Sequence, residues 1–268
     1  MSQIRPAAVS GSFYPRQPEA LAQEVAALLG TAKQHKPAIP KALIAPHAGY
    51  IYSGPVAASA YALLAPARGR IERVVLLGPA HFVQLRGLAL PDVSGFATPL
   101  GLVPLDEASV ETLSRLPQVL HSKAAHATEH SLEVHLPFLQ TVLEKFTLVP
   151  LAVGDATPEE IAEVLDLLWG GEETLIVVSS DLSHYLPYET ARTVDLQTAQ
   201  AILDLREFIS HQQACGASPV NGLLLAAQRH GLKPHLLDLR NSGDTAGDRS
   251  RVVGYAAFAF NESARNVH

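Results

Sequence analysis

Short apolar runs rich in β-branched residues alternate along the chain with longer stretches in which apolar residues recur at helical spacing. This alternation is typical of β–α units built around a largely buried sheet. The predicted strands are Ala42–Ala45, Arg73–Leu77, Phe146–Val153, Leu175–Ser179, His235–Leu239 and Val252–Phe260. The predicted helices are Pro18–Leu29, Pro55–Leu64, Glu107–Leu116, Leu132–Lys145, Pro158–Trp169, Glu189–Leu205 and Pro219–His230. We therefore expect an α/β fold with a central, largely parallel or mixed β-sheet flanked by helices.

Local signals mark two helix ends. Thr157, Pro158 and Glu159 together supply an N-cap, a proline for the first helical position and an acidic first turn. Gly231 directly follows a helical pattern, where a glycine can take positive φ as a C-cap. Proline and glycine are otherwise spread as turn residues, and no linker, repeat or low-complexity tract is present. We expect one domain spanning residues 1–268.

Composition excludes several classes of protein. With 47% hydrophobic and 17% charged residues, a chain of 268 residues can bury a substantial core and is not broadly disordered. Its 20 basic against 26 acidic residues leave a net charge of −6, which offers no electrostatic footprint for nucleic acid. We expect no membrane span and a cytoplasmic location, because no apolar run reaches about 18 residues and the N-terminus lacks a signal-peptide pattern.

Histidines follow three of the predicted strands. The first, second and fourth strands run within a few residues into His47, His81 and His184, and Asp181 lies just before the last of these. In open α/β sheets, ligands bind outside the carboxyl ends of the strands, so these side chains converge if the strands are parallel and close. The chain also contains 12 histidines in all, an unusually high number. The pattern predicts a shared site at one sheet edge.

Cys215 is the single cysteine, so the chain forms no internal disulfide. It precedes the helix predicted from Pro219, where the helix dipole would stabilise a thiolate, the form that binds metals or attacks substrates. A buried, inert thiol is the alternative. Two imidazoles and one thiolate could hold zinc, iron or copper with one position open, although their wide sequence spacing is not a local metal motif.

A second histidine cluster lies at residues 129–135. His130 and His135 are five residues apart, unlike the i and i+4 histidines of HExxH, and cannot share one helical face. His130 and Glu133 can share a face at i and i+3. We expect His130 to approach the site while His135 packs elsewhere. Walker A, GxGxxG and GxSxG motifs are absent, which leaves nucleotide-binding and serine-hydrolase functions without support.

Several motifs, taken in order, resemble those of the Memo family. They are Gly11-Ser12-Phe13-Tyr14-Pro15, Ala45-Pro46-His47-Ala48-Gly49-Tyr50, Leu77-Gly78-Pro79-Ala80-His81, Glu129-His130-Ser131-Leu132-Glu133, Ser180-Asp181-Leu182-Ser183-His184 and Cys215-Gly216. The set extends over nearly the whole chain. The resemblance implies a fold similar to the class III, LigB-like extradiol dioxygenases, with a metal-capable pocket at the sheet edge.

The resemblance also implies roles for individual residues. His47, His81 and Cys215 match the metal ligands of the family, and Asp181 and His184 match its remaining pocket pair. Four further motif residues are expected to line or support this pocket, namely Phe13, Tyr50, His130 and Glu133. In prokaryotes such proteins are associated with radical SAM enzymes and AMMECR-type proteins, so the chain is also similar to protein B of the AmmeMemoRadiSam system.

Three functions remain open at this point. The first is an iron- or copper-dependent redox or oxygen-dependent role on an unknown small molecule or protein, with His184 as a proton shuttle and Asp181 orienting a histidine. A thiolate in place of a carboxylate favours softer ions, so catechol cleavage does not follow. The second is a non-enzymatic module that binds a peptide or protein in the same pocket. The third is a nucleophilic cysteine and histidine hydrolase, whose activity would be lost on alkylation of the thiol and would not depend on a metal.

Overall fold

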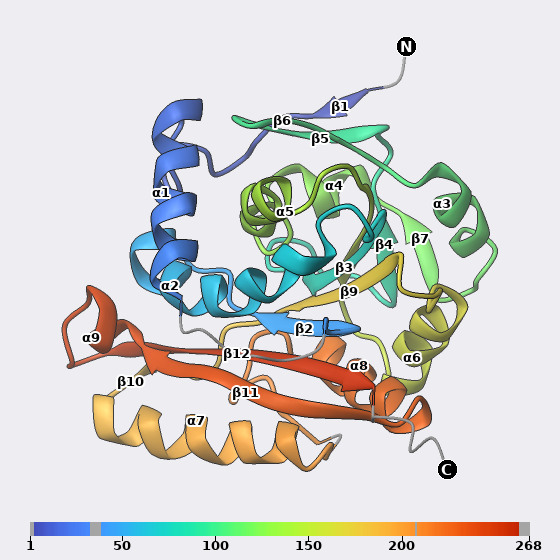
Figure 1. Cartoon of the computed structure of the whole chain (residues 1–268). Helices are drawn as coiled ribbons and strands as arrows, with labels where there is room; N and C mark the ends of the chain where they lie inside the picture. The colour runs from blue at the N-terminus through green and yellow to red at the C-terminus, as the bar shows by residue number, and fades with distance from the viewer. Residues whose placement is uncertain (1–2, 33–38, 207, 263–268) are drawn as a thin grey trace, which may run out of the picture.

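The computed structural model describes residues 3–32, 39–206 and 208–262. Within this part of the chain the central sheet has nine strands (Figure 1). In spatial order they are β10 (His184–Leu186), β12 (Val252–Glu262), β2 (Ala42–Ala45), β9 (Thr174–Ser179), β3 (Arg73–Pro79), β8 (Thr147–Val153), β4 (Leu88–Leu90) and β7 (Val119–His121), with β11 (Leu232–Asn241) paired to β12. Strands β2, β9, β3 and β8 are parallel, whereas β12 and β4 run antiparallel to β2 and β8. All six predicted strands are present in this mixed sheet.

Helices cover the sheet. The α-helices are α1 (Pro18–Thr31), α2 (Tyr50–Tyr61), α3 (Glu107–Leu113), α4 (Lys123–Ala127), α5 (Leu136–Val142), α6 (Pro158–Leu167), α7 (Tyr188–Leu203), α8 (Ala217–Arg229) and α9 (Ser242–Thr245), and two 3-10 helices are η1 (Ala62–Ala67) and η2 (Glu133–His135). In Figure 1, α1, α2 and α5 lie on one side of the sheet, and α6, α7 and α8 lie on the other. The predicted α/β class, with a central sheet between helical layers, is confirmed.

From Val74 on, strand β3 is apolar and shows no alternation of polar and apolar residues. Val74 and Leu76 pack in the core under α1, α2 and α5, while Val75 and Leu77 pack in the second core, under α6 and α8. Because successive strand residues point to opposite faces, a strand covered on both sides needs apolar residues throughout. The neighbouring parallel strands are buried in the same way.

The two predicted helix ends are confirmed. Thr157 caps α6 in a capping box, in which its hydroxyl accepts from the Glu160 N–H and the Glu160 carboxylate accepts from the Thr157 N–H. Gly231 has φ +66° one residue beyond the C-cap of α8. This left-handed conformation is open to glycine without a steric cost.

Two predicted helices have the wrong limits. The helix predicted at Pro55–Leu64 begins at Tyr50 instead, because extended Gly49 caps it and accepts a hydrogen bond from the Ser53 N–H. Pro55 therefore lies inside α2.

The helix predicted at Leu132–Lys145 is not continuous. It consists of η2 followed by α5, and Pro137 occupies the first turn of α5, where its missing N–H breaks no helical hydrogen bond. The chain before η2 is then left as a loop, which reaches the carboxyl edge of the sheet.

A second, three-stranded sheet was not predicted. It consists of β1 (Ile4–Arg5), β5 (Gly95–Thr98) and β6 (Gly101–Pro104), with β1 parallel to β5 and β5 antiparallel to β6. These short strands lack a long apolar run; β5 and β6 form a local hairpin, whereas β1 pairs with β5 from a distant part of the chain. In the described residues, no helix is long and apolar enough to cross a bilayer.

Candidate metal centre

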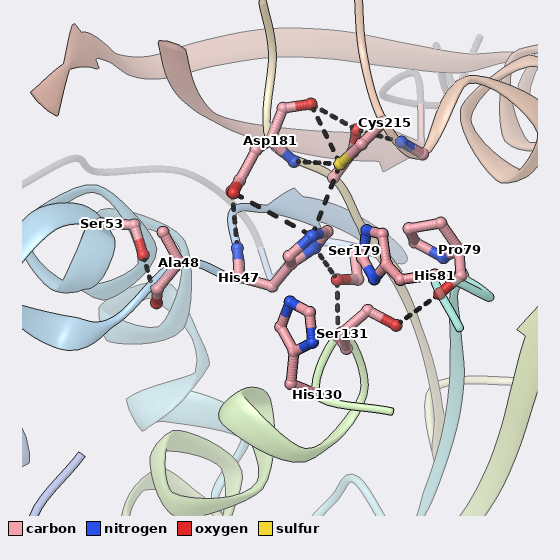
Figure 2. A network of polar contacts seen from close by, with 12 residues as sticks. His47, Ala48, Ser53, Pro79, His81, His130, Ser131, Ser179, Asp181 and Cys215 are labelled. Carbon is pink, nitrogen blue, oxygen red and sulfur yellow. Dashed lines mark hydrogen bonds and ion pairs between the residues drawn. The ribbon is translucent and has the colours of Figure 1, made fainter. Parts of the chain in front are cut away.

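Three histidines meet at the carboxyl edge of the parallel strands. His47 follows β2, His81 follows β3, and His130 comes from the loop before η2. One ring nitrogen from each lies within 4.8 Å of those of the other two, and these residues form the one such group found in the described chain. Figure 2 shows the three rings around a common centre. The predicted convergence of strand ends is therefore confirmed for His47 and His81, and His130 approaches them as expected.

The orientation of His47 is set by a hydrogen-bond chain beneath it. Its Nδ1 lies 2.6 Å from the Ser179 Oγ, and this hydroxyl donates its hydrogen to the Ser131 carbonyl, 2.6 Å away. Since the hydroxyl hydrogen is already used, Ser179 accepts from a protonated Nδ1 of His47. The unprotonated nitrogen of His47 is then Nε2, the atom that a metal requires.

His81 is fixed by a buried carboxylate. Glu129, 2% exposed, accepts from the His81 backbone N–H at 2.6 Å and from its ring Nδ1 at 2.9 Å. Burial alone would raise the pKa of Glu129, but the hydrogen bonds and charge of His81 outweigh it and lower the pKa to about 2. Because an ionised carboxylate only accepts, His81 donates through a proton on Nδ1, which leaves Nε2 as the ring nitrogen that can bind a metal. This is the carboxylate–histidine pairing common around metal ligands.

His130 completes the group from the side. Its ring stacks on His81 with centroids 4.7 Å apart and planes 11° apart, and it packs against Phe13 at 4.8 Å. Burial lowers the pKa of His130, and burial together with the neighbouring imidazoles lowers the pKa of His47 well below its usual value. Neutral imidazole is the metal-binding form, so the site favours ligation over protonation.

Cys215 contacts the opposite side of His47 (Figure 2). Its Sγ lies 3.4 Å from the His47 Nε2 and accepts from the Asp181 N–H at 3.3 Å. Burial, and then the negative charge of Asp181, raise the pKa of the Cys215 thiol. A thiol in this environment stays protonated unless a cation takes its proton's place. The predicted ligand set of His47, His81 and Cys215 stays a prediction.

Asp181 ties the cysteine and histidine loops together. One carboxylate oxygen accepts from the His47 backbone N–H at 2.8 Å, and the other lies 4.0 Å from the His47 Nε2. Burial raises the pKa of Asp181 to about 6, against the lowering effect of the hydrogen bond from His47 and the charge of His184. His184 donates its Nδ1 hydrogen to the Leu182 carbonyl at 2.8 Å, so this bond does not use its Nε2.

The other predicted pocket residues lie in different positions. Phe13 reaches the site through its contact with His130. The Tyr50 ring instead packs on Phe138 in the core, and its hydroxyl donates to the Val134 carbonyl. Glu133 is fully buried, and its carboxylate binds the N-terminal segment rather than the histidines.

Sequence reasoning missed two residues that orient the histidines. Glu129 lies in the same motif as His130, but both Glu129 and Glu133 were available and only the fold distinguishes them. Ser179 ends a predicted strand beside Asp181, and the position of a hydroxyl at the strand's carboxyl end is the one signal that could have identified it. His135 packs away from the cluster, as expected, with Nδ1 2.7 Å from the Tyr61 hydroxyl.

The donor set is suited to a transition metal. Three imidazoles, two of them with Nδ1 already hydrogen-bonded, are close enough to share one ion, and a sulfur and a carboxylate oxygen lie beside His47. A cavity of about 930 Å³ lies elsewhere, near Arg73, Thr147 and Leu102 at the amino ends of β3 and β8. It contains none of these donors.

Comparisons with known proteins agree with this architecture. The family model described as "Memo-like protein" matches residues 5–259. A MEMO1 family protein of Aquifex aeolicus is 37% identical over 96% of this chain and 99% of its own length, and one of Sulfolobus acidocaldarius is 34% identical over 97% and 100%. A third, of Ignicoccus hospitalis, is 36% identical over 96% and 98%.

Among solved structures, an uncharacterized Escherichia coli K12 protein, JW3007, matches with a TM-score of 0.51 over 82% of this chain and 99% of its own, at 16% identity. This match concerns the fold alone. The sequence matches extend over almost the entire chain at identities above one third. The chain belongs to the Memo family.

Proposed function

We propose that this protein binds a first-row transition metal at the three-histidine cluster and uses it in redox or oxygen-dependent chemistry on an organic substrate. The observation that carries the proposal is the orientation of His47 and His81. Ser179 and Glu129 each occupy one ring nitrogen, so both histidines present Nε2. A purely structural histidine cluster has no need for two separate groups that impose the same tautomer.

The donor set admits iron, copper or zinc, and the proposed redox role requires iron or copper. Imidazole suits iron, copper and zinc alike, while the nearby thiol of Cys215 favours softer ions. We propose His47, His81 and His130 as ligands, with Cys215 replacing or joining His130 in the alternative set that the family resemblance implies. Iron or copper would supply one-electron redox chemistry, whereas zinc would point to hydrolysis.

The chain's own residues would manage protons beside the metal. The Nε2 of His184 is not used by the Leu182 hydrogen bond, and the pKa of Asp181 near 6 lets this carboxyl exchange a proton close to neutral pH. Asp181 also anchors the His47 backbone and the Cys215 thiol, so it keeps both donors in place.

The test is the metal content of protein purified anaerobically without a metal-affinity tag. Wild type should hold near-stoichiometric iron or copper, and His81→Ala should lose it. Loss in His130→Ala but not in Cys215→Ser would identify the three-histidine set, and the converse would identify the set with the thiol. His230→Gln, which removes a surface histidine bound to Asp166, is the matched control and should keep the metal. Wild type that remains metal-free after reconstitution would contradict the proposal.

One observation favours a second function, the binding of a protein partner. Ile51, Phe82 and Tyr185 are 62–66% exposed, and each follows a site residue closely in sequence. Exposed apolar residues beside a site are typical of an interaction surface. A peptide, or the AMMECR-type and radical SAM proteins that the resemblance implies, would then bind here. Partner binding that survives chelation and Cys215→Ser would favour this function, and binding lost with the metal would exclude it.

A further inference from the structure

Tyr185 occupies an unusual backbone position beside the site. In the antiparallel pairing of β10 with β12, His184 faces Val253 and Leu186 faces Val252, so Tyr185 is an extra residue in a β-bulge. Its φ is +59°, in the left-handed region. A bulge with a left-handed residue normally carries glycine there, and a bulky aromatic residue pays a conformational cost in this position.

A comparison with Leu205 shows that Tyr185 lacks the usual local reason for such a backbone. Leu205 has φ +53°, but it comes directly after the C-cap of α7, where left-handed residues commonly end a helix. Tyr185 lies within a strand, with no helix end to require the conformation. Strained residues of this kind persist mainly at functional sites, and bulges there re-aim side chains.

The bulge directs the Tyr185 side chain to the region of the site. The ring is 62% exposed and lies 5.7 Å from the His184 ring. Tyr185 therefore lies beside His184, at the edge of the candidate site.

An arginine covers this exposed ring. The Arg251 guanidinium carbon lies 5.1 Å from the Tyr185 ring centroid. No carboxylate of the described residues pairs with Arg251, whereas Arg192, which lies over Tyr188, is paired with Glu189 at 3.3 Å. A guanidinium stacked on a ring keeps its edge N–H donors available, and their fork geometry matches the two oxygens of a carboxylate or phosphate.

We propose that Tyr185 and Arg251 form an anion-binding wall of the candidate metal site, which selects a substrate with a carboxylate or phosphate group bound by Arg251 and a flat apolar body on the Tyr185 ring. This inference rests on the proposed function for the identity of the site, but it concerns residues that hold no metal. The strain at Tyr185 is then explained by the need to present a ring, which glycine lacks.

Binding of three matched probes tests the proposal, with isothermal titration calorimetry on the protein as isolated. Benzoate and phenylphosphonate carry the two candidate anions, and benzamide is the neutral analogue. Both anions should bind more tightly than benzamide, and the stronger of them identifies the preferred group. Arg251→Gln should weaken anion binding at least about tenfold, as expected for loss of a charged hydrogen-bonded pair, and leave benzamide unchanged. Arg192→Gln is the matched control and should bind all three as wild type does.

Tyr185→Gly separates a binding role from a structural one. Glycine takes the left-handed backbone freely, so the thermal midpoint should stay equal or rise, while anion binding weakens severalfold. Anion binding that is unchanged in both Arg251→Gln and Tyr185→Gly would overturn the proposal, because a bound metal alone would then hold the anion. If wild type holds no metal but still binds the anions through Arg251, the proposed metal-dependent function is refuted and the anion-binding site stands. The failure of one proposal can therefore be told from the failure of the other.

Discussion

Removing the Glu133 carboxylate should destabilise the protein far more than removing an exposed glutamate. Glu133 is fully buried, and its carboxylate accepts four hydrogen bonds from the N-terminal segment. The donors are the Arg5 guanidinium at 2.6 Å, the backbone N–H groups of Ala8 at 2.7 Å and Val9 at 3.0 Å, and the Tyr14 hydroxyl at 2.6 Å. The Glu133 side chain therefore holds the N-terminal segment, residues 5–14, in place through four hydrogen bonds.

The magnitude follows from what each substitution leaves buried. Removing one partner of a buried ion pair costs about 3–5 kcal/mol, and each buried donor without an acceptor adds about 1 kcal/mol or more. Arg5, 4% exposed, also donates to the carbonyls of His126 and Glu129, which lessens the cost. We expect a loss of about 3 kcal/mol in the free energy of unfolding for Glu133→Gln, which keeps the shape, and about 5 kcal/mol for Glu133→Ala.

Urea denaturation followed by circular dichroism measures these losses, and hydrogen exchange at the Ala8 and Val9 amides localises them. Glu111→Gln is the matched control, because Glu111 pairs with Arg115 at 2.9 Å but both side chains are 75% exposed. Exposed helical pairs of this kind contribute little, so the control should be indistinguishable from wild type.

The refuting result is a Glu133→Gln variant as stable as the Glu111→Gln control, with unchanged exchange at the two amides. Such a result would mean that the segment is held by apolar packing alone. If the loss is as large as expected, metal affinity should fall as well, because the segment positions Phe13 against His130.

Three further predictions concern other parts of the molecule. Glu129→Gln should lower metal affinity about 10- to 100-fold in chelator competition while the protein stays folded. Gly222→Ala should lower the free energy of unfolding by about 1–3 kcal/mol in urea denaturation, because the added Cβ would lie 2.3 Å from the Ile161 side chain. Gly30→Ala, whose Cβ would have no described atom within 4 Å, should instead stabilise helix α1 by about 0.5 kcal/mol. Burial raises the pKa of Asp195 from 3.8 to about 6, so the folded state binds this proton more tightly than the unfolded chain does. The bound proton stabilises the folded state fully below about pH 4, and this stabilisation is lost as the pH rises to about 6. The free energy of unfolding of Asp195→Asn should therefore rise relative to that of wild type by up to about 3 kcal/mol across this pH window. Denaturation at a series of pH values measures the difference, and a difference that does not change with pH would contradict the prediction.

The apolar pattern by itself determined the parallel core and where its histidines lie. Strands β2, β3, β8 and β9 are buried on both faces, and only continuous apolar runs satisfy that environment. Residues that follow such runs must emerge at one edge, which is why the convergence of His47 and His81 followed from sequence alone. The caps of α6 and α8 were equally readable, because they depend on a few neighbouring residues.

Tertiary structure decided the parts that depend on contacts between distant segments. In the small sheet, β1 pairs with β5 about 90 positions further along the chain, and no local sequence pattern predicts this pairing. Pro137 splits a helical pattern whose apolar spacing alone looked continuous. Which of Glu129 and Glu133 supports His81 was settled by where the loop before η2 meets β3, since both carboxylates are near in sequence. Sequence determines which groups reach the edge of a sheet, but the protons and partners of those groups are set only by neighbours that folding brings into hydrogen-bond distance.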